Sequence, residues 1–252
     1  MRDFLVVLLE APLASFGEEA GNSQRGTANR PTRSSLLGLV GAALGILRSD
    51  VEGQKKLSRS LSTSTRTLSS GVLVRDFHTY ESIPQAKGSF MTRRQALGSG
   101  EAITSITQRE YRSGGVWQAA YVAGPATGQD SLSLELLADA FLTPKFTLWL
   151  GRKSCPLSAP VMPRIIAAES LAQAFHCHAE QVGRAAGFGE GVIFTDNNGL
   201  LPNSKVPLRH NRRNDEPLNR STWTFIGRDE WEFMTTDETD SGHDHKSPTV
   251  TR

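Results

Sequence analysis

The stretch RPTRSSLLGLVGAALGILR, residues 30–48, sets the architecture of this chain. Its apolar side chains recur at the spacing of one helical face, at Leu36, Leu39, Val40, Ala43 and Leu47. The opposite face carries Gly38, Gly41 and Gly45 rather than polar residues, so we expect a helix that is buried on more than one side. Because each glycine costs roughly 1 kcal/mol relative to alanine inside a helix, neighbouring groups are expected to approach these positions closely.

The first turn of this helix is predicted to bind an anion. Thr32 or Ser34 is suited to cap the helix, and the remaining free N–H groups and the helix dipole favour negative charge. Arg30 and Arg33 flank the turn, and no Asp or Glu occurs between residues 20 and 49. A phosphate is the expected ligand. The alternative that this stretch leaves open is a capped core helix with solvated arginines.

Charge is unevenly distributed along the chain. The 252 residues carry a formal net charge of +2. Seven acids lie between residues 229 and 244, where there is no Lys or Arg, which leaves +9 on the rest of the chain. A basic body favours a polyanionic partner. The two cysteines, Cys155 and Cys177, indicate a reducing, cytoplasmic location. The apolar run at residues 4–9 is too short for an export signal or a membrane span.

The order of predicted elements indicates an α+β, ferredoxin-like fold. Strands are expected at 4–9, 61–68, 72–77, 106–112, 116–123 and 146–150, with a hairpin turn at Gly114-Gly115. Helices are expected at 30–48, at 50–60 behind a capping box of Ser49 and Glu52, and at 131–141. This order matches the split βαβ motif, a sheet type that many single-stranded RNA readers use. Further along we expect a helix at 169–179, strands at 191–195 and 222–226, and a disordered tail from 235.

Two further basic segments suggest contacts with nucleic acid. Residues 146–163, FTLWLGRKSCPLSAPVMP, place Arg152 and Lys153 after a glycine turn, with no acid between residues 140 and 168. We interpret this as a second phosphate-facing loop, with a solvated basic turn as the alternative. A long insertion and the strand after it interleave basic and aromatic side chains, which suits a single strand. These residues are Lys87, Phe90, Arg93, Arg94, Arg109, Tyr111 and Arg112. The alternative is a mobile surface loop.

Catalysis and metal binding are weaker hypotheses. His78, Tyr80, Lys87 and Tyr111 are groups that could serve as acids and bases in RNA cleavage. The runs His176-Cys177-His178 and His243-Asp244-His245 contain metal-ligand types without the spacing of a four-ligand zinc site. We expect neither a metal nor a cofactor.

Five motifs in order along residues 1–165 resemble the CasD family, RAMP-type CRISPR-associated proteins of the type I-E Cascade surveillance complex. They are APLASFG (11–17), PTRSSLLGLVGAALGI (31–46), RDFHT (75–79), ITQREY (106–111) and LGRKSCPL (150–157), with a weaker echo in RDEW (228–231). The resemblance implies a ferredoxin-like, RRM-like palm at 1–165 with a protruding thumb at about 79–108. A C-terminal extension at 166–234 and an acidic tail at 235–252 would follow.

The same resemblance implies a non-catalytic RNA-binding subunit that caps the 5′ handle of the CRISPR RNA. It would dock the backbone subunit and the large subunit, and would meet target DNA only indirectly. The implied RNA contacts are Arg30, Thr32, Arg33, Ser34, Arg75, His78, Thr79, Arg93, Arg94, Arg109, Tyr111, Arg152, Lys153 and Ser154. A related protein of another type I subtype is an endoribonuclease, so metal-independent cleavage of repeat RNA is the competing hypothesis. A free-standing single-strand binder is a third. Residues 180–220 match no motif and receive no role.

Overall fold

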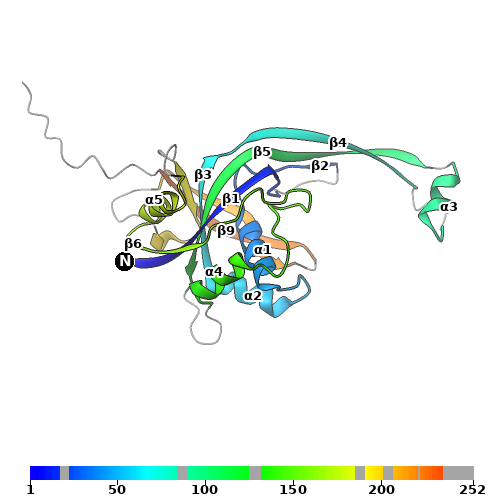
Figure 1. Cartoon of the computed structure of the whole chain (residues 1–252). Coiled ribbons are helices and arrows are strands. Elements are labelled where there is room, and N and C mark those ends of the chain that lie inside the picture. The colour runs from blue at the N-terminus through cyan, green and yellow to red at the C-terminus, as the bar shows by residue number, and fades with distance from the viewer. Residues whose placement is uncertain are drawn as a thin grey trace, which may run out of the picture.

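A large sheet forms the body of the protein, and a long two-stranded arm projects from it (Figure 1). The computed structural model describes residues 1–17, 23–83, 90–100, 102–124, 132–184, 191–200, 207–220 and 222–234. The predicted tail, Lys87 and the His243–His245 run lie outside these residues. The strands are β1 (Arg2–Ala14), β2 (Gln24–Arg25), β3 (Leu61–Ser69), β4 (Val72–Ser82), β5 (Ile103–Ala123), β6 (Arg164–Ala168), β7 (Val192–Thr195), β8 (Arg209–Asn219) and β9 (Thr224–Met234). The helices are α1 (Arg33–Leu44), α2 (Val51–Ser60), α3 (Arg93–Gly98), α4 (Leu134–Leu142) and α5 (Leu171–Gln181), with a 3-10 turn, η3 (Asn198–Leu200). The predicted α+β class is confirmed.

The strands of the body follow the order β6-β1-β5-β3-β7-β9-β8, and each neighbouring pair is antiparallel. Both faces of β1 are covered. Leu5 and Val7 belong to the core shared with α1 and α4, whereas Phe4 and Val6 belong to a second core with α5. Successive side chains of a strand point to opposite faces, so the continuous apolar run in β1 follows from a sheet that is buried on both sides.

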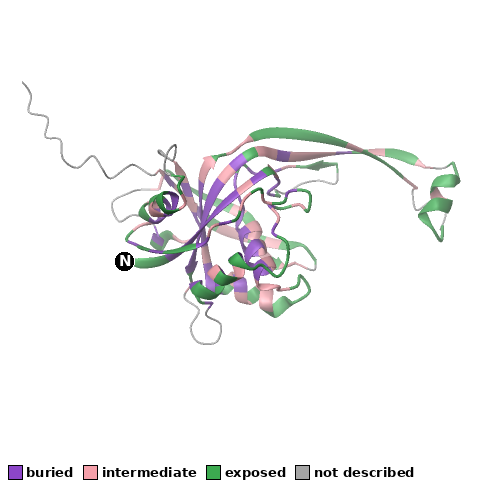
Figure 2. Cartoon of the chain, in the orientation of Figure 1, coloured by how far each residue is buried: buried purple, intermediate pink, exposed green. Residues whose placement is uncertain are grey.

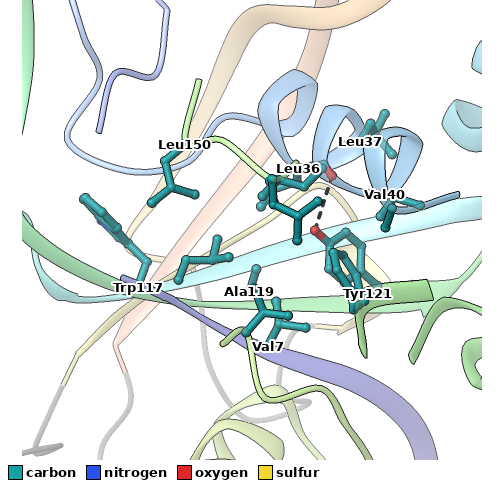
Figure 3. Close-up of a cluster of buried hydrophobic side chains, with 14 of the residues drawn as sticks. Val7, Leu36, Leu37, Val40, Trp117, Ala119, Tyr121 and Leu150 are labelled. Carbon is teal, nitrogen blue, oxygen red and sulfur yellow. Dashed lines mark hydrogen bonds between the residues drawn. The ribbon is translucent and has the colours of Figure 1, made fainter. Parts of the chain in front are cut away.

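The first core joins α1 to the sheet (Figure 3). Leu36 and Val40 of α1 lie over Val7 of β1 and Ala119 of β5. The fully buried Tyr121 donates a hydrogen bond from its hydroxyl to the Leu36 carbonyl, at 3.3 Å. Burial raises the pKa of Tyr121, so the hydroxyl stays protonated and keeps this bond.

The ends of α1 and its glycines each have an identifiable physical role. Thr32 caps the helix, as one of the two predicted alternatives requires. The helix ends at Leu44, earlier than predicted, because Gly45 adopts the left-handed conformation with φ 77° and its N–H and that of Ile46 bond back to the last turn. A Cβ at Gly41 would lie 3.3 Å from Leu57 of α2, so this glycine allows the two helices to approach closely.

The predicted hairpin turn at Gly114-Gly115 is wrong, because β5 runs through these residues as one strand of 21 residues. β3 pairs with the second half of β5 and β4 with the first half, and both run antiparallel to it. The two glycines lie where β5 changes its pairing partner from β4 to β3, and they do not reverse the chain. Gly114 has φ 68°, and a Cβ at Gly115 would lie 2.0 Å from the Trp117 ring. Opposite them, a Cβ at Gly71 would lie 2.5 Å from the Ser113 carbonyl oxygen.

The arm consists of β4 and the first half of β5, with α3 at its far end (Figure 1). Most of β4 is exposed (Figure 2). Several exposed arm residues are apolar: Phe77 is 63% exposed and Ile106 57%. The paired register extends from Val72 with Ser113 to Ser82 with Ile103, so the arm begins nearer the body than the predicted insertion.

The predicted strand at 146–150 is also wrong. The N–H groups of Lys145 and Phe146 bond to the carbonyls of Ala43 and Ala42 at the end of α1, at 3.0 Å each, which draws this segment away from the sheet. The place beside β1 is taken by β6, a strand that was not predicted from the sequence. The capping box at Ser49 is wrong by one residue, since the side chain of Asp50 caps α2. Within the described residues, no helix has the length and apolar character needed to cross a membrane.

Candidate nucleic-acid interface

A groove of about 1100 Å³ lies between the start of α1, the loop before and after Gly151, and the β8–β9 hairpin. Three residues predicted to bind RNA line it, and they come from two segments more than 100 positions apart: Thr32, Ser34 and Arg152. The opposite wall carries Arg212, Arg213 and Arg220 of the hairpin region. The groove therefore joins the two basic segments that the sequence singled out.

The motif LGRKSCPL forms a tight loop anchored at both ends. Leu150 and Cys155 are fully buried, and the Leu150 N–H donates to the Cys155 carbonyl at 2.8 Å. Gly151 has φ 93°, and a Cβ there would lie 1.8 Å from the Ser15 carbonyl oxygen. Only glycine fits such a backbone-to-backbone approach. The motif thus fixes the backbone from which Arg152 projects.

Arg152 is held where the arm leaves the body. Its guanidinium lies 4.8 Å from the ring centroid of Tyr111 and donates to the carbonyls of Glu110 and Arg25, at 3.4 and 3.2 Å. None of these partners carries a negative charge, so the positive charge of Arg152 is not neutralised by them. Lys153 and Ser154 are exposed beside it. Tyr111 itself is buried and positions the guanidinium rather than facing the groove.

Arg220 crosses the glycine face of α1. Its Nη2 donates to the Ser34 carbonyl at 2.6 Å. A Cβ at Gly38 would lie 3.7 Å from its Nη1, so the glycine leaves room for this guanidinium. Burial lowers the pKa of Arg220, and its Nε has no hydrogen-bond partner among the described residues. An anion in the groove would stabilise this charge.

Arg30 and Arg33, which were expected to hold phosphates, point into the protein. Arg33 is 7% exposed and donates to Glu216, Asp196 and the carbonyls of Leu61 and Ser58. Arg30 donates to Glu230, and burial lowers its pKa. Protein acceptors take these donors and both side chains are buried, so neither arginine faces the groove.

The anion at the start of α1 is a carboxylate of the chain itself. Asp215 of β8 accepts the backbone N–H of Arg33 at 2.9 Å. The same carboxylate accepts two bonds from Arg228, at 2.6 and 3.0 Å. Burial opposes the charge of Arg228, but its hydrogen bonds and the charges of Asp215 and Glu230 outweigh burial and raise its pKa. The acids missing between residues 20 and 49 are thus supplied by the C-terminal third.

The remaining candidates lie along the arm. Arg75 forms an exposed ion pair with Glu110, at 2.9 Å. Thr79 is exposed on β4, and Arg109 of β5 stands opposite Asp76. Arg93 and Arg94 begin α3 at the far end, where Arg93 donates to the Glu81 carbonyl.

The predicted acid–base set is not brought together in the described residues. His78 Nε2 lies 2.7 Å from Asp76 on the arm, whereas Tyr111 stands opposite Val74. Four ladder positions separate the His78 and Tyr111 levels, which is roughly 13 Å along a strand. On α5, His178 is fully buried and bonds Gln118 and the Met162 carbonyl, while His176 is exposed beside Glu180. The described residues contain no group of three or more side chains that could hold a metal.

The wall of the groove formed by the β8–β9 hairpin was not predicted from the sequence. The signal present was the basic run RHNRRN at 209–214, together with Arg220 and Trp223. The positive charge of this run was not evident from the sequence because two acids, Asp215 and Glu216, follow it directly. In the structure these acids form ion pairs with Arg228 and Arg33.

The chain is similar over most of its length to proteins of CRISPR systems. The family described as "CRISPR-associated protein (Cas_Cas5)" matches residues 4–229. The CRISPR system Cascade subunit CasD of Escherichia coli (strain K12) is 33% identical over 169 residues, which cover 64% of this chain and 70% of that protein.

Two solved structures share the fold. A chain of a CRISPR RNA-guided surveillance complex has a TM-score of 0.63 at 21% identity, over 92% of this chain and 90% of its own. A crystal structure of a Cas protein has a TM-score of 0.58 at 20% identity, over 92% of this chain and 94% of its own. At these identities the likeness establishes the fold alone.

Proposed function

This chain belongs to the CRISPR-associated Cas5 family, and we propose that it is the Cascade subunit that binds the 5′ handle of the CRISPR RNA without cutting it. The observation that carries the proposal is the groove in which the start of α1, the Arg152 loop and the β8–β9 hairpin converge. Single-stranded RNA is held by charge along its backbone and by stacking of its bases. The groove offers arginines and aromatic side chains together.

Within this proposal the hydroxyl of Ser34 and the guanidiniums of Arg152, Arg212 and Arg220 contact the handle, while Thr32 lines the groove and keeps its hydroxyl in the cap of α1. Lys153 and Ser154 extend the contact beside the loop. Arg75, His78, Thr79 and Arg109 line its path along the arm, and Arg93 and Arg94 act at the far end.

We further propose that the arm docks neighbouring subunits, namely the backbone subunit and the large subunit that meets target DNA. Exposed apolar side chains on a projecting element favour a protein partner, and Phe77, Ile106 and Met91 are 63%, 57% and 95% exposed.

A ferredoxin-like palm is supported by four strands in the order β6-β1-β5-β3, all antiparallel. This is the arrangement that a split βαβ unit produces when α1 and α4 cover one face. The palm and thumb would then extend through β6 to residue 168, three residues beyond the expected boundary at 165, and the extension and the tail would be 169–234 and 235–252.

The test is a salt titration of binding between the full chain and a single-stranded RNA that carries the handle sequence of its own CRISPR array. The slope of log affinity against log salt changes by about 0.7 for each phosphate of a single strand that the protein neutralises. Arg152→Ala and Arg212→Ala should each lower the slope by about that amount, and the RNA should stay intact throughout.

Arg164→Ala is the matched control, because Arg164 is exposed on β6, at the opposite end of the strand order from β8. It should leave the slope unchanged. Slopes for Arg152→Ala and Arg212→Ala equal to that of the wild type would overturn the groove as the handle site. Cleaved RNA would favour the endoribonuclease hypothesis instead.

A further inference from the structure

The turn between β8 and β9 presents a tryptophan at the edge of the groove. Trp223 is 56% exposed and lines the groove together with Phe225 and Trp149. Its φ is 52°, a left-handed conformation that turns usually give to Gly or Asn. A bulky aromatic side chain at such a position implies a use that offsets the cost.

The Trp223 ring is held by its neighbours before any ligand arrives. The Arg48 guanidinium lies 4.2 Å from the ring centroid, and its Nε donates to the Arg220 carbonyl at 2.6 Å. The Phe225 ring is 6.2 Å away and inclined by 28°. The Arg48 guanidinium therefore covers part of one face of the indole, and Trp223 still keeps 56% of its surface exposed for a ligand. Trp223 and Phe225 belong to the same hairpin that carries Arg212 and Arg220.

The groove around this surface is positively charged. Arg152, Arg212, Arg213 and Arg220 line it, and Asp215, the acid among its described lining residues, is engaged by Arg228 and by the α1 start. A protein anchor of Trp type is expected in an apolar, desolvated surround. A flat aromatic beside several arginines instead fits a nucleobase whose flanking phosphates bind the cations.

We infer that Trp223 is a base-stacking platform, on which one unpaired base of the bound RNA lies while Arg212 and Arg220 hold the adjacent phosphates. The inference rests on the proposed handle-binding function and adds to it a residue that no motif of the family resemblance includes. Because every base has a π-face, the platform tolerates any base at that position and adds affinity more than sequence preference.

The experiment measures affinity of the full chain for the handle RNA and for a set of RNAs with one abasic position each. Trp223→Ala should weaken binding of intact RNA by about 5- to 100-fold and leave the salt slope unchanged, since the same phosphates stay bound. Trp223→Phe should restore most of the affinity. One abasic RNA should bind wild type and Trp223→Ala equally, which identifies the stacked base as a double-mutant cycle does.

Leu218→Ala is the matched control, because Leu218 is 53% exposed on the same hairpin and does not line the groove. Thermal unfolding of each variant checks that the hairpin is intact. A second readout is tryptophan fluorescence: RNA should quench it in the wild type and less in Trp223→Phe, where only the quenching of Trp149, which also lines the groove, remains.

Two results would overturn the inference, and they are distinguishable. Unchanged affinity of Trp223→Ala, with Arg152→Ala still weakened, would remove the platform and leave the handle-binding function standing. Absence of RNA binding by the wild type would remove both. Loss of neighbouring subunits from Trp223→Ala, with RNA binding unchanged, would reassign Trp223 to a protein contact.

Discussion

Arg33 and Ser34 are neighbours in the sequence, but they belong to two regions with opposite roles. The Arg33 side chain lies in the interior, where Asp196 and Glu216 neutralise it. Ser34 lines a groove of about 1100 Å³ that is also lined by Arg152, Arg212 and Arg220. The same residue type therefore stabilises the fold on one side of this helix start and is proposed to bind RNA on the other.

The difference between the two regions arises from the C-terminal third of the chain. That third supplies Asp196, Asp215, Glu216 and Glu230 to the interior arginines, and it supplies Arg212 and Arg220 to the groove. None of these partners is included when charges are counted in the sequence around residue 33. For Arg33, segments 163 to 183 positions away decide whether the arginine is a structural or a binding residue.

The largest effect is expected from Arg33→Ala. Removing one member of a buried ion pair leaves the other charge buried and unpaired, which typically costs about 3–5 kcal/mol. Here two carboxylates and two carbonyls each lose the donor that Arg33 supplies, and among the described residues the carboxylates keep only the neutral donors Thr63 and Ser58. The free energy of unfolding, measured by denaturant titration, should fall by that amount, whereas the salt slope of RNA binding by the folded fraction should not change.

Arg164→Ala serves again as the control and should unfold like the wild type. A stable Arg33→Ala protein with a reduced salt slope would show that Arg33 faces the RNA, contrary to the interior network.

Much of the fold followed from local pattern. The apolar run of β1, the glycine helix with its Thr32 cap and the strand at β3 all depend on side chains within a few residues of one another. The failures involve distant partners. Gly114-Gly115 has the composition of a turn, but Trp117, Gly71 and the long pairing with β4 keep the chain extended. β6 was missed because RIIAA is too short to show a period before β1 is placed beside it.

Only half of the candidate site could be predicted from the sequence, for the same reason. The Arg152 loop was identified because its charge and its glycine lie in one segment. The hairpin wall was missed because its arginines are interspersed with acids in the sequence, and only the folded chain separates them. Asp215 turns toward Arg228 and α1, while Arg212 and Arg220 line the groove.

A smaller effect, on both stability and binding, is expected from Gly151→Ala. The new Cβ would lie 1.8 Å from the Ser15 carbonyl oxygen, and φ 93° is strained for alanine. Overpacking and left-handed backbone together should cost about 2–3 kcal/mol and should displace Arg152. Gly183→Ala is the control, since Gly183 also has a positive φ, 69°, but has open space around it. Equal costs for the two variants would show that the close approach to Ser15 is unimportant.

The smallest effect on stability is expected from Arg75→Ala, which tests whether exposure is what separates the two kinds of arginine. Arg75 and Glu110 are 2.9 Å apart, as close as a good ion pair, but the Arg75 side chain is 64% exposed. Because water screens such a pair, Arg75→Ala should lower the free energy of unfolding by less than about 1 kcal/mol. The expected loss for Arg33→Ala is several times larger. If Arg75 contacts the handle, the salt slope of RNA binding by Arg75→Ala should be lower than that of the wild type by about 0.7. Glu110→Gln, which frees Arg75 from its partner, should keep or raise RNA affinity. A cost for Arg75→Ala as large as that for Arg33→Ala would mean that distance between the charges, and not burial, governs these arginines.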